Sequence, residues 1–211
     1  MEGRSHFAIG LATGVGLAVS SGSVDDVGMM ALTIVTASVA SLLPDIDEDG
    51  SLINNFLFPS LNRKFRSFAL ASLGVVAILL YFLKSLPLWV LLAGVFAAGV
   101  AYVPHRSVTH SLLATAYVTW TVYLISPSLA KAAAVGYLSH LLADALTRAG
   151  VPFFWPWMKK FNFSGIGIQI KSGGSEDKLI GNIAGILSAI GFVWLIGQII
   201  HAEAVSAGWL P

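Results

Sequence analysis

Seven apolar stretches follow one another along this chain, and they constrain its fold more than any other feature. They lie at about 6–21, 27–43, 67–84, 87–104, 111–126, 128–147 and 179–201. A helix that spans a bilayer needs roughly 20 consecutive apolar residues, so each stretch is a candidate membrane span. Only 11% of the residues are charged, whereas a soluble domain has about 25%. We therefore expect an all-α fold: a polytopic membrane helix bundle of about seven spans.

The seven stretches differ in quality. The first, second, fifth and sixth are short or are interrupted by small residues and histidine, so we expect some of them to be tilted or re-entrant. Glycine and alanine recur in GLATGVGLA and LIGNIAGILSAIG, which suits close helix packing in lipid. The first stretch has no convincing small-residue cleavage site, so we expect a retained helix and not a signal peptide. We expect residues 1–211 to form a single membrane-embedded domain.

Two polar connections are long enough to hold structure of their own, at 44–66 and 148–178. The second contains the aromatic run VPFFWPWMKKFNF, which is typical of an anchor at the membrane interface. Isoleucine then alternates with other residues in GIGIQI. Because this alternation is typical of extended chain, we expect a short extended or hairpin segment near 164–176.

Lysine and arginine are distributed unevenly between the two sides that seven spans would create. One side holds ten of them: Arg4, Arg63, Lys64, Arg66, Arg106, Arg148, Lys159, Lys160, Lys171 and Lys178. The other side holds only Lys84 and Lys131. Cytoplasmic loops carry the excess of positive charge in membrane proteins. We therefore expect the N-terminus in the cytoplasm and the C-terminus outside.

Histidine and aspartate gather on the same side as the positive charge. Seven such residues lie there on the seven-span count: His6, Asp45, Asp47, His105, His110, His140 and Asp144. Of the five histidines, only His201 lies on the other side. Ionisable groups in or near membrane spans are expensive and usually functional. This convergence predicts one polar site at the cytoplasmic face.

The spacing of these residues is typical of metal ligands. His140 and Asp144 are four apart, so they share one face of a helix. Asp45 and Asp47 follow a helix-ending proline and can both point into one site from an extended turn. The two histidines of PHRSVTHS are five apart across a turn, and they can approach one ion or two adjacent ions.

The chemistry of the ligands narrows the choice of metal. Imidazole with carboxylate suits zinc, manganese or iron, and we expect zinc or manganese more than magnesium. Seven ligands exceed the four that one tetrahedral ion needs. We therefore expect two ions, bridged by Asp45 or Asp144, that would activate a water and bind a phosphoryl group. Arg106 is the expected phosphate-binding residue, and we expect Lys171 and Glu176 to contact the substrate. Asp45, Asp144 and Arg106 are the expected catalytic residues.

Several other functions are less consistent with the sequence. The stretch PDIDEDG matches the start of a calcium-binding loop, but Phe56 stands where that loop needs glutamate. The chain has no cysteine, which excludes disulfides and thiolate metal sites. No basic run indicates nucleic-acid binding, and no GxSxG motif indicates a serine nucleophile.

Four stretches, together with the early His6, carry a resemblance to a known family. LLPDID, HRSVTHSLL, GYLSHLLADALTRAGVPFFWP and KSGGSEDKLI resemble the YdjM-type family of inner-membrane metal-dependent hydrolases, also described as LexA-regulated or LexA-binding. The resemblance runs from His6 to about Leu179. It implies a multi-helix protein of the prokaryotic inner membrane, with the same seven residues as ligands of a divalent metal and with hydrolase activity. A more distant similarity to zinc-dependent phospholipase C implies a phosphoester substrate.

The leading hypothesis is therefore a metal-dependent hydrolase that cleaves a phosphoester, in a lipid or a small molecule, at the cytoplasmic face. The first alternative is a transporter of metal ions or protons, which would place its ligands near the bilayer midplane. The second is a non-catalytic scaffold, which would use a closed site of four ligands. The expected partners are the lipid bilayer and the substrate, with no nucleic acid, and the oligomeric state stays open.

Overall fold

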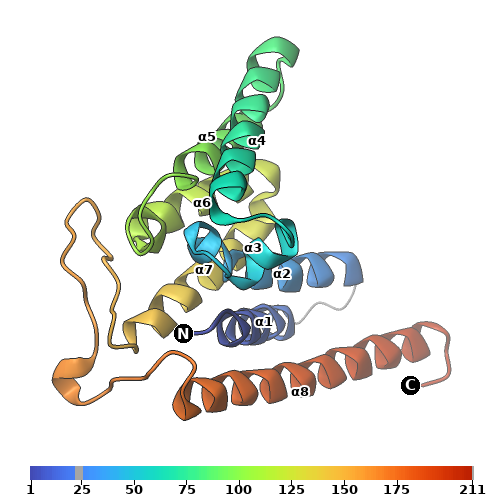
Figure 1. The fold of residues 1–211 in the computed structure, drawn as a ribbon. Coiled ribbons are helices and arrows are strands. Elements are labelled where there is room, and N and C mark those ends of the chain that lie inside the picture. Colours follow the sequence, from blue (N-terminus) through green and yellow to red (C-terminus); the bar gives the residue numbers. More distant parts are fainter. Residues whose placement is uncertain (22–25, 211) are drawn as a thin grey trace.

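The computed structural model describes residues 1–21 and 26–210, which fold mainly into eight α-helices (Figure 1). The helices are α1 (Gly3–Ser20), α2 (Val27–Ala40), α3 (Leu52–Leu57), α4 (Arg63–Lys84), α5 (Leu88–Val100), α6 (Leu112–Ile125), α7 (Ala130–Ala145) and α8 (Ser175–Ser206). Four short 3-10 turns join them: η1 (Leu43–Asp47), η2 (Val108–His110), η3 (Pro127–Leu129) and η4 (Ser164–Ile166). Within these two ranges no strand occurs, so the predicted all-α class is confirmed.

Each of the seven expected spans coincides with one of the longer helices. Two of these, α4 and α8, are long and apolar enough to cross a membrane, with 22 and 32 residues. The other five have 13 to 18 residues, which is less than the roughly 20 that a full crossing needs. The apolar helical character is therefore established, while a count of seven complete spans stays a prediction.

The hairpin expected near 164–176 is not confirmed. The segment begins with the 3-10 turn η4, and α8 already starts at Ser175. Between them, Ile170 makes one isolated parallel bridge with Thr147. The side chain of Ile166 is 73% exposed. Alternating isoleucines form a strand only where a neighbouring strand continues the ladder, and none does so in this described segment.

Several helices begin where a polar side chain caps them. Asp26, Ser51, Asn62 and Ser111 each accept a hydrogen bond from a backbone N–H three residues later. Such caps satisfy backbone donors that have no partner inside the helix. Ser111 follows His110 directly, so the cap of α6 also fixes the turn that carries this histidine.

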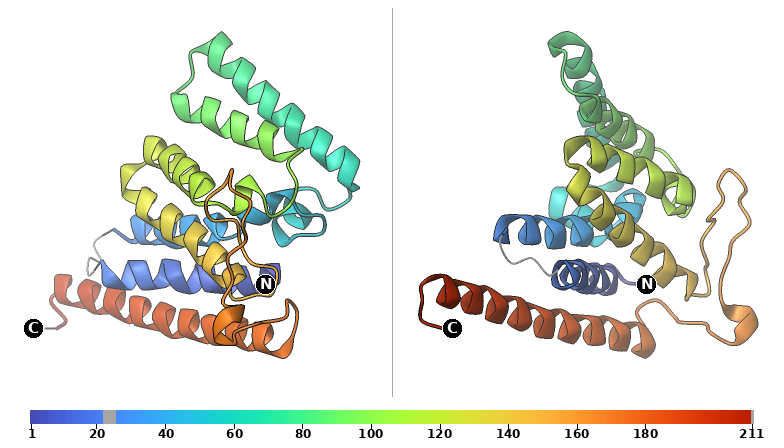
Figure 2. Two further views of the ribbon diagram at one scale, coloured as in Figure 1. Left: turned by 90° about the vertical axis from the view of Figure 1, so that its left-hand side faces the viewer. Right: turned by 180° about the vertical axis from the view of Figure 1, so that it is seen from behind.

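The helices form a closely packed group and a separate pair (Figure 2). In the group, α1 packs against α2, α7 and α8, and α2 also packs against α7. Small residues allow this contact. A Cβ atom added to Gly14 would lie 2.8 Å from the Cα of Ile34 on α2, and one added to Gly136 would lie 2.8 Å from the Cα of Ala37. Backbone contact of this kind is how helices associate in lipid.

The separate pair consists of α4 and α5, which extend away from the other helices in Figure 2. The two helices meet at glycine, since a Cβ atom on Gly74 would lie 2.6 Å from the carbonyl oxygen of Gly94. The pair contacts the other helices where α5 packs against α6, and the start of α4 lies near the turns that follow α2. There Arg66 pairs with Asp49 at 2.6 Å, which holds the start of α4 close to η1.

Candidate metal centre

The seven predicted ligands come from four parts of the chain that meet at one end of the helix bundle. His6 lies in the first turn of α1, Asp45 and Asp47 in η1, His105 and His110 in and before η2, and His140 and Asp144 in the last turns of α7. The structure brings these residues together even though the first and last are far apart in sequence. Six of them form two groups of three whose potential ligand atoms lie within 4.8 Å of one another.

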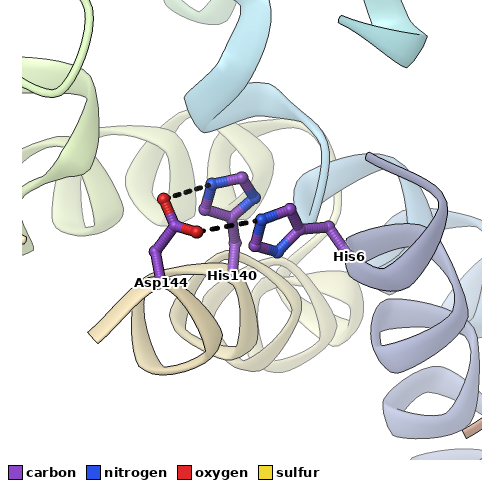
Figure 3. Close-up of side chains that lie close together, drawn as sticks. All are labelled: His6, His140 and Asp144. Atoms are coloured by element: carbon purple, nitrogen blue, oxygen red, sulfur yellow. Dashed lines mark ion pairs between the residues drawn. The ribbon is translucent and has the colours of Figure 1, made fainter. Parts of the chain in front are cut away.

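The first group is His6, His140 and Asp144, which Figure 3 shows in close-up. All three side chains are buried. Nε2 of His6 lies 3.2 Å from Oδ1 of Asp144. The rings of His6 and His140 stack with their centroids 3.6 Å apart and their planes at 14°. The close contact of α1 with α7 therefore sets the relative position of two imidazoles and one carboxylate.

The second group is Asp45, His105 and His110. Nε2 of His110 lies 3.4 Å from Oδ1 of Asp45, and the rings of His105 and His110 meet edge to face at 4.9 Å. His110 is fully buried, whereas His105 is 26% exposed and lies on the outer side of the group. This group is carried by turns and not by helix interiors.

The two groups adjoin through His110 and His140, whose Nε2 atoms are 3.3 Å apart. Carboxylates lie beside both rings. Oδ1 of Asp45 is 3.4 Å from Nε2 of His110 and 3.5 Å from Nε2 of His140. Oδ2 of Asp144 is 3.6 Å from Nε2 of His110. Each of the two carboxylates therefore reaches ligands of both groups, as a bridging carboxylate must.

Hydrogen bonds on the far sides of the two rings fix their tautomers. Nδ1 of His140 donates to the carbonyl oxygen of Ser41 at 2.7 Å. The hydroxyl of Thr109 donates to Oδ2 of Asp47 at 2.8 Å, so it accepts from Nδ1 of His110 at 3.1 Å. In a neutral imidazole the other nitrogen then carries a lone pair. Both Nε2 lone pairs point into the cluster, where a cation relieves their mutual repulsion and makes them ligands.

His6 gives a second test of whether the site suits a metal. Both of its ring nitrogens are buried and neither makes a well-aligned hydrogen bond among the described residues, although Nε2 lies 3.2 Å from Oδ1 of Asp144. A buried polar atom without a partner costs about 1–3 kcal/mol. Coordination of a divalent cation by Nε2 would satisfy that atom. The residues therefore fit the divalent metal ion that the sequence predicts.

Asp47 is the predicted ligand that lies outside both groups. Its Oδ1 is 2.9 Å from Nδ1 of His105, and its Oδ2 accepts from Thr109. Both oxygens are therefore used to orient neighbouring side chains. A carboxylate behind a ligating histidine commonly plays this part in metal sites.

The charges of the turn residues shift their pKa values. Burial lowers the pKa of His105, but the hydrogen bond that its Nδ1 donates to Asp47 and the negative charge of Asp47 outweigh burial and raise this pKa above the usual value. Burial lowers the pKa of His110 below its usual value. A neutral His110 at physiological pH is the form that binds a metal ion.

Arg106 also lies in the cluster. Its Nη2 is 2.7 Å from Oδ2 of Asp144, and its Nη1 is buried without a partner in the described structure. The backbone of Arg106 has a φ of 57°, which is uncommon for a residue with a side chain. The amino group of Met1 also contacts Asp144. Two cationic groups, the Arg106 guanidinium and the Met1 amino group, therefore contact this carboxylate.

The other two predicted substrate contacts lie apart from the cluster. Lys171 and Glu176 are exposed, and no described contact joins either of them to the metal ligands. Sequence reasoning missed their neighbour Asp177, which is fully buried. Its Oδ2 accepts from the backbone N–H of Glu2 at 2.9 Å and of Gly173 at 2.8 Å. An acidic residue in the first turn of a helix was the available signal.

Comparisons with known proteins place the chain in a family. Residues 1–205 match the family described as YdjM inner membrane protein. Inner membrane protein YdjM of Escherichia coli (strain K12) is 45% identical over 64 residues, which is 27% of this chain and 33% of that protein. The protein of the same name from Shigella flexneri matches to the same extent. The matched part therefore spans a third of the length of these relatives, and no solved structure matches the chain. The chain belongs to the YdjM family of inner membrane proteins.

Proposed function

We propose that this protein is a membrane-embedded, divalent-metal-dependent hydrolase that cleaves a phosphoester at the cytoplasmic face of the inner membrane. The observation that carries the proposal is the junction of the two ligand groups. There, the Nε2 atoms of His110 and His140 lie 3.3 Å apart, between the carboxylates of Asp45 and Asp144. The four imidazoles and two carboxylates of the two groups suit a pair of zinc or manganese ions.

The residues divide between two ions. His6, His140 and Asp144 would hold one, and Asp45, His105 and His110 would hold the other. Bound there, the ions would lower the pKa of a water molecule and polarise a phosphoryl oxygen. The structural role of Asp47 is to hold His105 by its hydrogen bond to Nδ1.

The remaining polar groups act on the substrate. Nη1 of Arg106 has no partner among the described residues, so it is available to donate to a phosphate oxygen and to stabilise negative charge in the transition state. Asp45, which is partly exposed to solvent, accepts the proton of the attacking water. Lys171 and Glu176, both exposed, remain proposed contacts with the substrate.

The positions of the ligands support a hydrolase over a transporter. The ligands lie in the first turn of α1, in the last turns of α7 and in the turns η1 and η2. A substrate that carries its phosphate at head-group depth can reach such a site from the membrane surface. A transporter needs a site near the midplane, and a structural site needs only four ligands.

The test combines metal content with turnover. Full-length protein is purified as wild type, Asp45→Ala and His140→Ala, with His201→Ala as the matched control because His201 lies on α8 and is exposed. We expect two equivalents of metal in wild type and control, and a loss of at least one in both site variants. A screen of phosphoesters and phospholipids then identifies the activity, which we expect only in the metal-loaded wild type and control. Wild-type protein that takes up no zinc or manganese, or metal-loaded protein inactive on every phosphoester, contradicts the proposal.

The cytoplasmic placement has a separate test. A reporter fused to the C-terminus should report the periplasm, because seven spans place the two termini on opposite sides. A cytoplasmic reporter signal would refute the seven-span topology while leaving the metal site in place.

A further inference from the structure

An apolar pocket lies between α5 and α6 and reaches Thr109, which precedes the candidate ligand His110. Its volume is about 180 Å³, and its wall includes Phe96 and Gly99 of α5, Leu113 and Tyr117 of α6, and Thr109 of η2. Thr109 is the residue that hydrogen-bonds both Asp47 and His110. Apolar cavities of roughly 150 Å³ take up molecules the size of benzene. The pocket therefore accommodates a short length of hydrocarbon chain immediately beside the candidate metal centre.

A second pocket adjoins the first and has a different chemistry. Its volume is about 440 Å³, and its wall includes Arg63, Lys64 and Ser67 of α4 together with Asp47. Val103 lines both pockets, and the hydrogen bond between Thr109 and Asp47 connects them at the metal centre. Basic pockets between membrane helices on the cytoplasmic side commonly bind anionic lipid head groups.

The two pockets together match an amphiphile with an anionic head group. A small soluble phosphoester makes no use of an apolar pocket, and a neutral hydrocarbon makes no use of Arg63 and Lys64. We propose that the protein binds one anionic phospholipid, with the head group in the cationic pocket and part of one acyl chain in the apolar pocket. Cleavage of this lipid rests on the proposed function, whereas its binding does not.

Gly99 gives a direct way to block the apolar pocket. Gly99 lines the pocket, and a Cβ atom added to it would meet nothing within 4 Å, so we expect a larger side chain there to occupy the pocket without displacing a helix. Gly197 on α8 has the same open surroundings and is also exposed. Gly197→Leu is therefore the matched control for Gly99→Leu, and Gly99→Ala is a milder variant for the case that the leucine variant folds poorly.

The experiment uses a phosphatidylglycerol with a photoreactive diazirine in its acyl chain. Full-length protein is reconstituted in phosphatidylcholine nanodiscs with a trace of this probe, and mass spectrometry maps the adducts. We expect adducts on α5 and α6 residues of the pocket in wild type and Gly197→Leu, fewer in Gly99→Ala and fewest in Gly99→Leu. An acyl chain is held against a membrane helix by packing, and a leucine at position 99 would take the place of the chain. We therefore expect the labelling of the pocket residues in Gly99→Leu to fall about threefold or more below wild type.

The head-group part is tested with the variant Arg63→Gln/Lys64→Gln. It should reduce labelling by the phosphatidylglycerol probe and leave labelling by the matching phosphatidylcholine probe unchanged. Adducts spread evenly over the exposed faces of α4 and α8, or equal labelling of wild type and both Gly99 variants, would overturn the proposal. Pocket labelling in a protein that hydrolyses no phosphoester would refute the proposed function and leave the lipid site standing.

Discussion

Glycine allows close contact between helices in two regions of the molecule, the α4–α5 pair and the group of α1, α2 and α7, but the two regions differ in what the contact surrounds. Both bring backbones together at glycine, as at Gly74 and Gly136. The pair turns large side chains outward, and Phe82 is 69% exposed. The group instead surrounds three fully buried histidines, His6, His110 and His140. Apolar side chains therefore suffice where helices face lipid, whereas the buried histidines are enclosed by helices that pack closely against one another.

The glycines of the group stand one helical turn from the ligands. Gly10 follows His6 by four residues, and Gly136 precedes His140 by four, so each lies on the same helix face as its histidine. A Cβ atom on Gly10 would clash with the side chain of Ser41, and the carbonyl of Ser41 accepts the hydrogen bond from His140. Small residues thus set the distance at which the two rings stack.

The largest expected effect comes from enlarging a glycine in each region. Gly136→Leu forces a side chain against the backbone of α2, and overpacking of this kind costs about 1–3 kcal/mol or more. It should also abolish metal binding, because α7 carries His140 and Asp144. Gly74→Leu should separate α4 from α5 at a similar cost in stability yet keep the metal. Unfolding in detergent measures the stability of both variants, and metal analysis measures their bound metal. Loss of metal in Gly74→Leu would contradict the conclusion that the α4–α5 pair is not needed for the metal site.

A smaller effect is expected from Thr109→Val, which keeps the shape of the side chain and removes its hydroxyl. Asp47 and His110 each lose a hydrogen-bond partner, and loss of such an outer contact lowers metal affinity about 10–100-fold. Thr119→Val is the control, since the hydroxyl of Thr119 is buried with no partner in the described structure. Competition with a fluorescent zinc chelator measures the affinity. Equal affinity in both variants would show that the orienting hydrogen bonds are unimportant.

Asp177→Asn should act on the attachment of α1 to α8. The asparagine keeps an acceptor oxygen but loses the charge that strengthens the bonds from Glu2 and Gly173, so we expect a loss of about 1 kcal/mol. Hydrogen exchange of the first residues of α1 should rise in parallel. Unchanged exchange there would show that Asp177 does not hold the N-terminal segment.

The smallest effects are expected from Lys171→Gln and Glu176→Gln. Both side chains are exposed, and substitutions at such positions usually change stability by less than about 0.5 kcal/mol. Metal content should be unchanged as well. A selective rise in KM for a charged substrate would support their proposed contact with the substrate, and unchanged kinetics would remove both residues from the site.

Much of the architecture was predictable because hydrophobicity in a membrane protein is read directly from the sequence. Counting apolar stretches placed the His and Asp residues on one side, and the structure brings six of them into two adjoining groups. Which ring meets which carboxylate was not predictable. The stacking of His6 on His140 depends on which helices are neighbours in the folded protein. The orientation of Asp47 depends on the hydroxyl of Thr109.

Local patterns predicted less where the outcome depends on a distant partner. The alternation in GIGIQI indicated extended chain, but a single bridge to Thr147 is all that the fold provides. The charged loop at 171–178 drew attention to Lys171 and Glu176, whereas the buried residue is Asp177. Its burial follows from the docking of α8 on α1, a contact between the two ends of the chain.

The placement of His6 on the first helix and of Asp144 on the seventh has a consequence for biogenesis. The ribosome delivers α1 and α2 to the membrane well before α7 exists, so His6 and Asp45 enter without the partners that surround them in the folded protein. Ionisable groups in lipid are costly until they are paired. A nascent chain arrested after α6 holds neither His140 nor Asp144, so it lacks the residues that join the two ligand groups. If the site holds metal as proposed, its loading would therefore be a late step of assembly that follows insertion of α7.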